Sequence, residues 1–153
     1  MSAEVMSKSP SSGLGFITVS DGTVLKLRIS IIDIREIGFS PHGGINFDVK
    51  AMGGVSTHTI PEELKKMVVD KPIVPTYPPE PPPDGWEILD IKKQEPATIG
   101  EIVDTSKGKY RVRVVADVVM VSRNAKYKTL LDEPLYWVSW VWKISWKPVK
   151  PGG

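Results

Sequence analysis

The sequence predicts a mainly β fold, an antiparallel sandwich or open barrel with one short α-helix and a proline-rich connector. Three observations favour this class: long runs in which apolar and polar residues alternate, tight-turn signals between these runs, and only one segment with helical periodicity. Alternation with a period of two turns one face of a strand toward a core and the other toward solvent. Long strands joined by tight turns are typical of antiparallel sheets, and the pattern leaves sandwich and barrel as alternatives.

The first half of the chain is predicted to form strands separated by turns. Turn residues gather in Asp21-Gly22, in the segment 40–44 and in Gly53-Gly54. The strands expected around these turns cover residues 16–19, 23–34, 45–49 and 55–59. In the second of these strands the apolar positions are odd up to Ile31 and even from Ile32. A slip of one residue inside a strand predicts a β-bulge, which bends the strand.

The segment after Thr59 carries the one convincing helical pattern. Thr59 and Glu62 have the spacing of a capping box, and Pro61 is tolerated in a first helical turn. Residues 62–70 are therefore predicted to form a short helix that covers one end of a sheet. Its apolar face is expected to consist of Leu64, Met67 and Val68.

Residues 72–83 contain seven prolines and are predicted to be extended chain. A stiff connector between strand-rich blocks is favoured over a docking ligand for a partner's aromatic groove, because the segment lies inside the chain. We expect residues 1–12 to form a flexible N-terminal tail and residues 13–153 to form a single β-rich domain. A division of the sheet into two parts at the connector 71–85 stays open.

The second half of the chain is predicted to contain four further strands. They cover residues 86–91, residues 99–104, Tyr110 to Met120 and Tyr136 to Trp146, with a hairpin turn at 106–108. In the strand that begins at Tyr110, one apolar face is expected to continue without a break as far as Met120. Arg111 and Arg113 lie on the opposite face.

The last strand holds four of the five tryptophans. One of its faces carries Tyr136, Val138, Trp140, Trp142, Ile144 and Trp146. Four large aromatic side chains of ~200 Å² each, at ~25 cal/mol/Å², correspond to a gross burial free energy of roughly 20 kcal/mol. Because the net stability of a domain is only about 5–15 kcal/mol, this face must be core or interface, and the sequence does not choose between them.

The composition excludes several classes of protein. The absence of cysteine excludes disulfides, thiolate metal sites and cysteine nucleophiles. No apolar run approaches 18 residues and the first residues lack an apolar signal region, so we expect no membrane association, no export and a cytoplasmic location. Few side-chain amides together with no cysteine are typical of a protein from a hot environment.

The sequence contains no recognisable catalytic, cofactor or metal motif. The two histidines, His42 and His58, together with Asp48 lack a spacing that would make them converge on a metal, and an exposed or packed histidine is favoured. Asp33 and Glu36 are three positions apart on a strand and face opposite sides, so they form no carboxylate pair. We therefore expect a protein that is not an enzyme and that needs no cofactor.

The charge of the chain is asymmetric. Residues 77–104 carry two basic and seven acidic side chains, a net charge of 2 − 7 = −5, whereas residues 105–153 carry ten basic and three acidic, 10 − 3 = +7. Segregated charge can mark a nucleic-acid surface. The favoured interpretation is an acidic strand beside a basic one, with ion pairs across the strands.

Two hypotheses for function follow. The favoured one is a non-enzymatic accessory or structural protein that binds another protein or a second copy of itself, with Tyr77, Trp137 and Trp146 as candidate interface residues. The alternative is a single-stranded nucleic-acid-binding β-barrel protein that uses Arg111, Arg113, Trp137, Lys143 and Lys147. The first predicts an apolar patch or an unpaired strand edge, and the second a continuous positive face with an exposed Trp137.

Overall fold

The computed structural model describes residues 12–74 and 80–150, and every element named below lies in these ranges. The first strands are β1 (Gly13–Val19), β2 (Val24–Gly38) and β3 (Asn46–Thr59), and the helix α2 (Glu62–Met67) follows them. The later strands are β4 (Trp86–Leu89), β5 (Ile91–Glu95), β6 (Ala97–Thr105), β7 (Gly108–Asn124) and β8 (Leu135–Pro148). The prediction of a mainly β fold with antiparallel strands and a short helix is confirmed.

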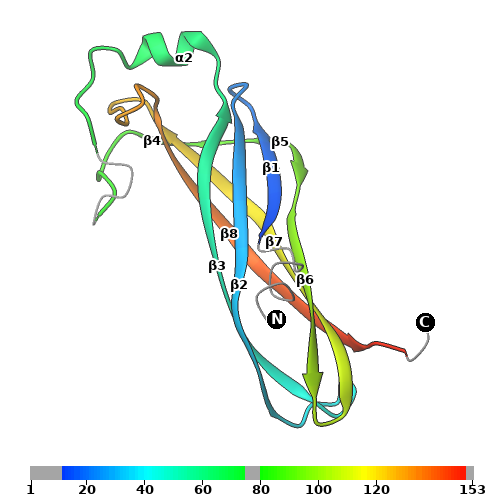
Figure 1. Ribbon diagram of the computed structural model, residues 1–153. Coiled ribbons are helices and arrows are strands. Elements are labelled where there is room, and N and C mark those ends of the chain that lie inside the picture. The colour runs from blue at the N-terminus through cyan, green and yellow to red at the C-terminus, as the bar shows by residue number, and fades with distance from the viewer. Residues whose placement is uncertain (1–11, 75–79, 151–153) are drawn as a thin grey trace, which may run out of the picture.

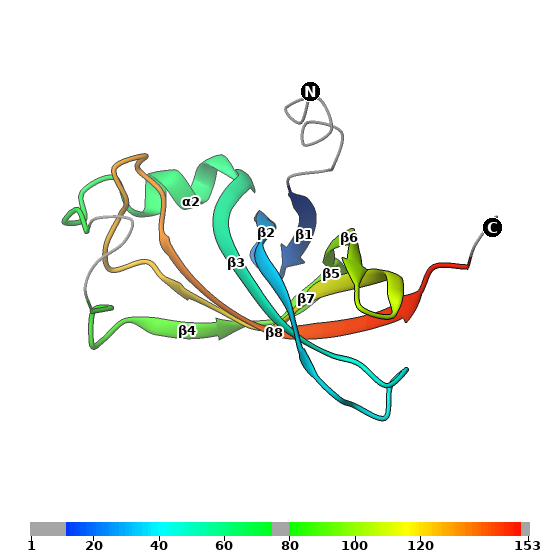
Figure 2. The same cartoon turned by 60° about the horizontal axis from the view of Figure 1, so that its bottom comes forward.

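The strands form two antiparallel sheets. The first has the order β3-β2-β1-β5, and the second is built around β7. Because β8 pairs with β7 along residues 110–124, β4 and β6 share the opposite edge of β7, end to end. The two long pairs, β2–β3 and β7–β8, cross one another, with α2 beyond the end of β3 (Figures 1 and 2).

The turns predicted at Asp21-Gly22 and in the segment 40–44, and the bulge predicted in β2, lie where the sequence predicts them. The Asp21-Gly22 turn joins β1 to β2, with Gly22 at a φ of 92° that favours glycine. The carboxylate of Asp21 accepts a hydrogen bond of 2.9 Å from the backbone N–H of Thr23 and so stabilises the turn. The pairing of β2 with β3 shifts register between Ile31 and Asp33, which confirms the predicted bulge.

Three local predictions are wrong. Gly53-Gly54 is not a turn but lies in the middle of β3, where Gly53 pairs with Ile29. Thr59 does not cap the helix: it ends β3, and Pro61, whose side chain has no acceptor, takes the capping position. The helix α2 is also shorter than predicted, and it buries Leu64 and Val68 but leaves Met67 exposed.

A fourth prediction, an unbroken apolar face on β7, is also wrong. The register between β7 and β8 shifts between Val118 and Met120, so Met120 turns outward and is exposed while Val121 is fully buried. The side chain of Gln94 stabilises this bulge. Its amide donates to the backbone C=O of Val118 at 3.0 Å, and its carbonyl accepts from the N–H of Val118 at 2.7 Å.

The two sheets are joined on one side by the passage from β5 to β6. The chain leaves the first sheet at Glu95, passes against Gly15 of β1 and enters the second sheet at Ala97. A Cβ atom at Gly15 would lie 2.5 Å from the backbone nitrogen of Ala97, so only glycine allows the strands to approach so closely. This side of the structure is therefore closed by backbone.

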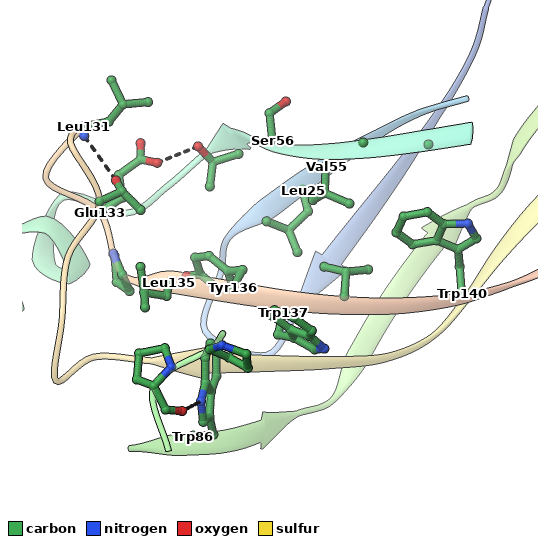
Figure 3. A pocket seen from close by; sticks show the side chains of 18 residues that line it. Leu25, Val55, Ser56, Trp86, Leu131, Glu133, Leu135, Tyr136, Trp137 and Trp140 are labelled. Carbon is green, nitrogen blue, oxygen red and sulfur yellow. Dashed lines mark hydrogen bonds between the residues drawn. The ribbon is translucent and has the colours of Figure 1, made fainter. Parts of the chain in front are cut away.

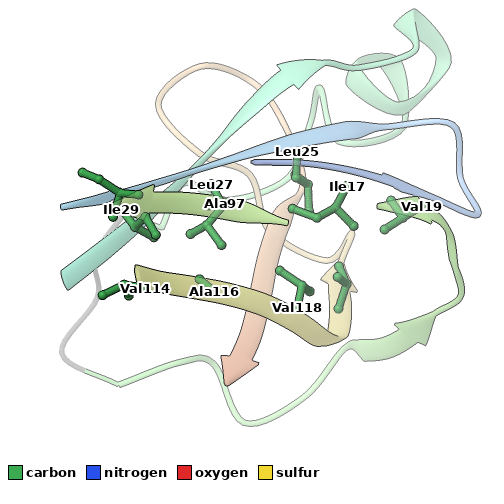
Figure 4. Close-up of a cluster of buried hydrophobic side chains, with 11 residues drawn as sticks. Ile17, Val19, Leu25, Leu27, Ile29, Ala97, Val114, Ala116 and Val118 are labelled. Atoms are coloured by element: carbon green, nitrogen blue, oxygen red, sulfur yellow. The ribbon is translucent and has the colours of Figure 1, made fainter. Parts of the chain in front are cut away.

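A hydrophobic core lies between the two sheets. Its largest cluster takes buried side chains from both sheets (Figure 4), among them Ile17, Leu25, Leu27, Ile29, Val114, Ala116 and Val118. A second, smaller cluster at the other end of the long strands contains Ile45, Phe47, Tyr110 and Val112. Alternation along β1, β2 and β7 places these residues on the inner faces, as the period of two predicts.

The acidic and basic parts of the chain meet in the second sheet. Asp104 of β6 and Lys109 of β7 form an ion pair of 2.7 Å, and Glu87 of β4 pairs with Arg123 of β7. These contacts confirm the interpretation of the charge asymmetry as pairs across adjacent strands. No helix in the described ranges is long and apolar enough to cross a membrane.

Candidate binding groove

The side opposite the β5–β6 passage is open. The strands β3 and β8 each have 14 residues and each forms the outermost strand of its sheet. Within residues 12–74 and 80–150, no backbone hydrogen bond joins either outer edge to another segment. An edge strand presents a row of N–H and C=O groups that a further strand can pair with. The fold therefore has two free edges on its open side.

A groove of about 420 Å³ lies between these two strands. One wall is the continuous stretch Gly53 to Thr57 of β3, and the other is formed by Leu135 to Val138 and Trp140 of β8 (Figure 3). Leu25 of β2 contributes to the lining between the walls. The lining is mainly apolar and aromatic, which is typical of pockets that bind ligands or peptide side chains.

Trp140 closes one end of the groove by packing against a glycine. A Cβ atom at Gly53 would lie 2.9 Å from Cζ2 of Trp140, closer than an ordinary van der Waals contact. The absence of a side chain at Gly53 therefore makes room for the indole ring, which bridges from β8 to β3. At Gly54, by contrast, no atom of the described residues lies within 4 Å of the position of a Cβ.

A pair of tryptophans from β4 and β8, the two strands that flank β7, forms the other end. The rings of Trp86 and Trp137 meet edge to face, with centroids 6.2 Å apart. The indole N–H of Trp86 donates a hydrogen bond of 2.7 Å to the backbone carbonyl of Pro82, so the last prolines of the connector lie against this end. Pro81, Trp86, Trp137 and Ser122 also surround a second hollow of about 200 Å³.

A buried polar network lies beneath the groove and joins both sheets. The hydroxyl of Tyr136 donates to the carboxylate of Asp21 at 2.8 Å and lies 2.8 Å from the hydroxyl of Thr23. Arg123 pairs with the same carboxylate at 3.2 Å and with Glu87. Burial, together with the Asp21 carboxylate, raises the pKa of Tyr136 far above its ordinary value. For Arg123, burial lowers the pKa, and the carboxylates of Glu87 and Asp21 raise it by more.

The network fixes the turn of β1 and β2 against β7 and β8. Its hydroxyls and carboxylates bond to one another, and no nucleophile among them is paired with a free base. A further polar contact crosses the groove itself, where Thr57 of β3 donates to Glu133 at 2.7 Å. We assign these contacts to the support of the groove.

The aromatic face of β8 is divided between core and surface. Tyr136, Val138 and Trp140 pack on the main core, and Trp146 packs on the second cluster, with its ring 5.2 Å from that of Phe47. Between them, Trp142 and Ile144 remain 37% and 38% exposed although they point to the inner side. The structure thus places part of this face in the core and leaves Trp142 and Ile144 exposed, and an interface role for these two residues stays a prediction.

The four predicted basic residues lie together on the outer face of β7 and β8. Arg111 pairs in register with Lys147, and Arg113 with Ser145. Lys143 forms an ion pair of 2.9 Å with Asp117. Arg111, Arg113 and Lys147 form no ion pair with any residue in the described ranges.

Trp137 shares the outer face of β8 but not the neighbourhood of these cations. It is 50% exposed and packs on Trp86. Trp137 lies six positions before Lys143 and ten before Lys147, which correspond to about 20 and about 33 Å along a strand. Of the other predicted interface residues, Trp146 is partly buried and its indole N–H donates to the carbonyl of His42 at 3.2 Å. Tyr77 lies outside the described residues.

The residues weighed for chemistry form local contacts. His58 packs its ring against Phe16, with centroids 5.1 Å apart, and His42 lies in the exposed loop between β2 and β3. Asp33 pairs with Arg35 at 2.7 Å, and Glu36 accepts hydrogen bonds from Ser106. The Ser106 hydrogen bonds lower the pKa of Glu36. Within the described ranges, no three His, Asp or Glu side chains gather in a metal-binding cluster.

Sequence reasoning missed the wall of the groove in β3. Gly53 was interpreted as part of a turn, and neither Val55 nor Glu133 was considered as a site residue. The available signal was the pair of glycines inside an alternating pattern, which can mark a strand that a bulky group approaches closely. A scan against family models finds no match, and neither the curated proteins nor the solved structures give a match.

Proposed function

We propose that this protein acts through protein–protein interaction, by binding an extended segment of a partner along the groove and the free edge of β8. The observation that carries the proposal is that both walls of the groove are consecutive residues of edge strands, Gly53–Thr57 of β3 and Leu135–Val138 of β8. A segment that enters the groove meets unpaired backbone groups and apolar pockets together. Strand addition of this kind uses backbone hydrogen bonds for affinity and alternate side chains for specificity.

Energetics favour a segment with side-chain anchors. Ordering six residues of a flexible peptide costs about 6–12 kcal/mol at ~1–2 kcal/mol each. Six backbone hydrogen bonds contribute about 3–9 kcal/mol at ~0.5–1.5 kcal/mol each, which falls short of that cost. Apolar contacts supply the remainder at about 25 cal/mol/Å². The exposed Trp142 and Ile144 beside the edge, and the apolar groove, offer such contacts.

The test is the selection of decapeptides from a random library on the immobilised full-length chain, followed by hydrogen exchange on the complexes. We expect selected peptides to slow the exchange of backbone amides in β8 and in residues 53–57 of β3. The double variant Trp142→Lys, Ile144→Lys should lose most of the binding. Ile88→Lys is the matched control. Ile88 is 71% exposed on β4, which lies on the other side of β7 from the free edge of β8. The proposal would be contradicted if the unchanged chain, the double variant and Ile88→Lys bound the peptides equally well, or if the peptides slowed amide exchange only outside β8 and residues 53–57.

Binding of single-stranded nucleic acid is a second candidate. One observation favours it: Arg111, Arg113 and Lys147 lie side by side on one exposed face. Its weakness is the distance of the stacking residue Trp137 from these cations. Tryptophan fluorescence titrated with single-stranded DNA and RNA at two salt concentrations tests it. Saturable quenching with a log–log salt slope near −0.7 per phosphate contact, about −2 for three contacts, supports this candidate. No change at low salt removes it.

A further inference from the structure

From the charge and shape of β8 we infer that the partner segment alternates acidic and apolar residues and pairs with the free edge of β8 between residues 139 and 147. This inference rests on the proposed function, because it names the chemistry of the segment that the same edge binds. It concerns the half of β8 that lies beyond Trp140, where the inner face is exposed and the outer face is basic.

The two faces of β8 in this region differ sharply. The outer face carries Val141, Lys143, Ser145 and Lys147, and the inner face carries Trp142, Ile144 and Trp146. A strand added to the edge continues the pleat of the sheet, so its side chains lie alternately beside the outer and the inner residues of β8. One set of the partner's side chains therefore faces cations and the other set faces exposed apolar surface.

The partner side chains that lie beside the outer face of β8 meet a net positive charge. Arg111, Arg113, Lys143 and Lys147 contribute four positive charges and Asp117 one negative charge, which leaves 4 − 1 = +3. Carboxylates on the added strand would lie opposite the side chains of β8, where opposite charges stabilise cross-strand pairs. Lysine or arginine at the same positions would meet like charge. Charge complementarity therefore selects acidic residues on this side.

The inner set faces Trp142 and Ile144. Both side chains point toward the opposite sheet, yet each keeps more than a third of its surface exposed. The rings of Trp140 and Trp142 meet edge to face, with centroids 6.1 Å apart. This contact holds the exposed indole of Trp142 in place. Apolar side chains of moderate size on the added strand would cover this surface. The result is an alternating acidic and apolar segment.

A second copy of the chain fits this edge less well. Two copies paired through β8 would form one continuous sheet and bring both sets of four cations onto its outer face, where like charges repel. Lysine on an edge strand is a known device against such self-association. A nucleic acid would satisfy the cations but leave Trp142 and Ile144 uncovered, since they lie on the other face of β8.

Fluorescence polarisation of labelled synthetic decapeptides with the full-length chain tests the inference. The first peptide alternates glutamate with valine or isoleucine, the second replaces glutamate by lysine, and the third has the first composition in two blocks. We expect the alternating acidic peptide to bind at least tenfold more tightly than the other two. Lys143→Glu with Lys147→Glu should reverse the preference between acidic and basic peptides. Lys92→Glu, an exposed lysine of β5 in the other sheet, should change nothing.

Two N-methylated versions of the acidic peptide test the edge pairing without any change to the protein. One is methylated at odd and the other at even positions, so only one of them loses the N–H groups that face β8. We expect one version to bind at least tenfold more weakly and the other to bind as the parent does.

The outcomes separate the inference from the proposed function. If the lysine peptide binds as well as the acidic one and N-methylation still weakens binding, the acidic assignment is wrong and strand addition stands. If neither N-methylated version loses affinity, or no peptide binds while single-stranded DNA does, both are overturned.

Discussion

The two adjacent glycines of β3 are predicted to respond to the same substitution with opposite signs. At Gly53, a Cβ atom would lie 2.9 Å from Cζ2 of Trp140, 3.3 Å from Cγ2 of Ile29 and 3.4 Å from Cδ1 of Leu27. At Gly54, no atom in residues 12–74 and 80–150 lies within 4 Å of the corresponding position. Gly53→Ala therefore forces the indole of Trp140 to move, whereas Gly54→Ala adds a methyl group in open space.

The magnitudes follow from packing and from the unfolded chain. Carbon atoms pack best at about 3.5–4.0 Å, so the indole must shift by about half an ångström or more. Overpacking of this kind costs about 1–3 kcal/mol. Replacing glycine by alanine restricts the unfolded chain and stabilises the folded state by about 0.4–1 kcal/mol at a compatible site. We expect Gly53→Ala to lower the free energy of unfolding by about 1–2 kcal/mol and Gly54→Ala to raise it by up to about 1 kcal/mol.

Urea unfolding followed by circular dichroism measures both free energies. A third and a fourth variant, Trp140→Val alone and Trp140→Val with Gly53→Ala, complete a double-mutant cycle around Gly53 and Trp140. Without the indole ring, Gly53→Ala should lose most of its cost. The reasoning is refuted if Gly53→Ala is as stable as Gly54→Ala, or if the cost of Gly53→Ala is the same with and without the ring.

Two further predictions concern the polar contacts that join the sheets. Tyr136→Phe removes the hydroxyl that donates to Asp21 and should lower the free energy of unfolding by about 1–3 kcal/mol in urea titrations. Because burial raises the pKa of Tyr136, the unfolded chain loses this proton above about pH 10 while the folded protein keeps it, so stability should fall with rising pH by about 1.4 kcal/mol per pH unit. That part of the alkaline slope should be absent from Tyr136→Phe, and an unchanged slope would contradict the assignment. Gln94→Leu leaves the N–H and C=O of Val118 without their partner at the bulge of β7, and it should lower the free energy of unfolding by about 1–3 kcal/mol. The amide of Val118 should also exchange faster in Gln94→Leu than in Gln94→Glu, because the glutamate keeps an acceptor for this N–H.

Local signals in the sequence were sufficient wherever one short segment decides the structure. The Asp21-Gly22 turn needs a residue with positive φ, and the slip of apolar positions from odd to even within β2 predicts the bulge, although the bulge leaves Ile32 exposed and only Ile34 returns to the core. The alternating strand β8 was likewise predicted to within two residues at each end. In each case the pattern of side chains and the conformation of the backbone are tied within a few residues.

The errors arose where a distant segment decides the local structure. Gly53-Gly54 has the composition of a turn, and only the indole of Trp140, 87 positions later, explains why glycine stands inside a strand. Met120 continues the apolar alternation of β7, but the bulge that Gln94 binds turns it outward. Neither partner can be identified from the neighbouring sequence, because both contacts depend on how the two sheets cross.

The sequence by itself determined the fold class of this protein, the aromatic and basic faces of its last strand, and the core faces of β2 and β7 as far as the bulge in each strand. Period-two alternation assigns each side chain to a face wherever no bulge interrupts the strand. Only the tertiary structure decided that β3 and β8 are edge strands, that a groove lies between them, and that Trp142 and Ile144 stay exposed while Trp140 and Trp146 pack. Alternation states which face a side chain belongs to, but how far that face is covered depends on where the opposite sheet ends.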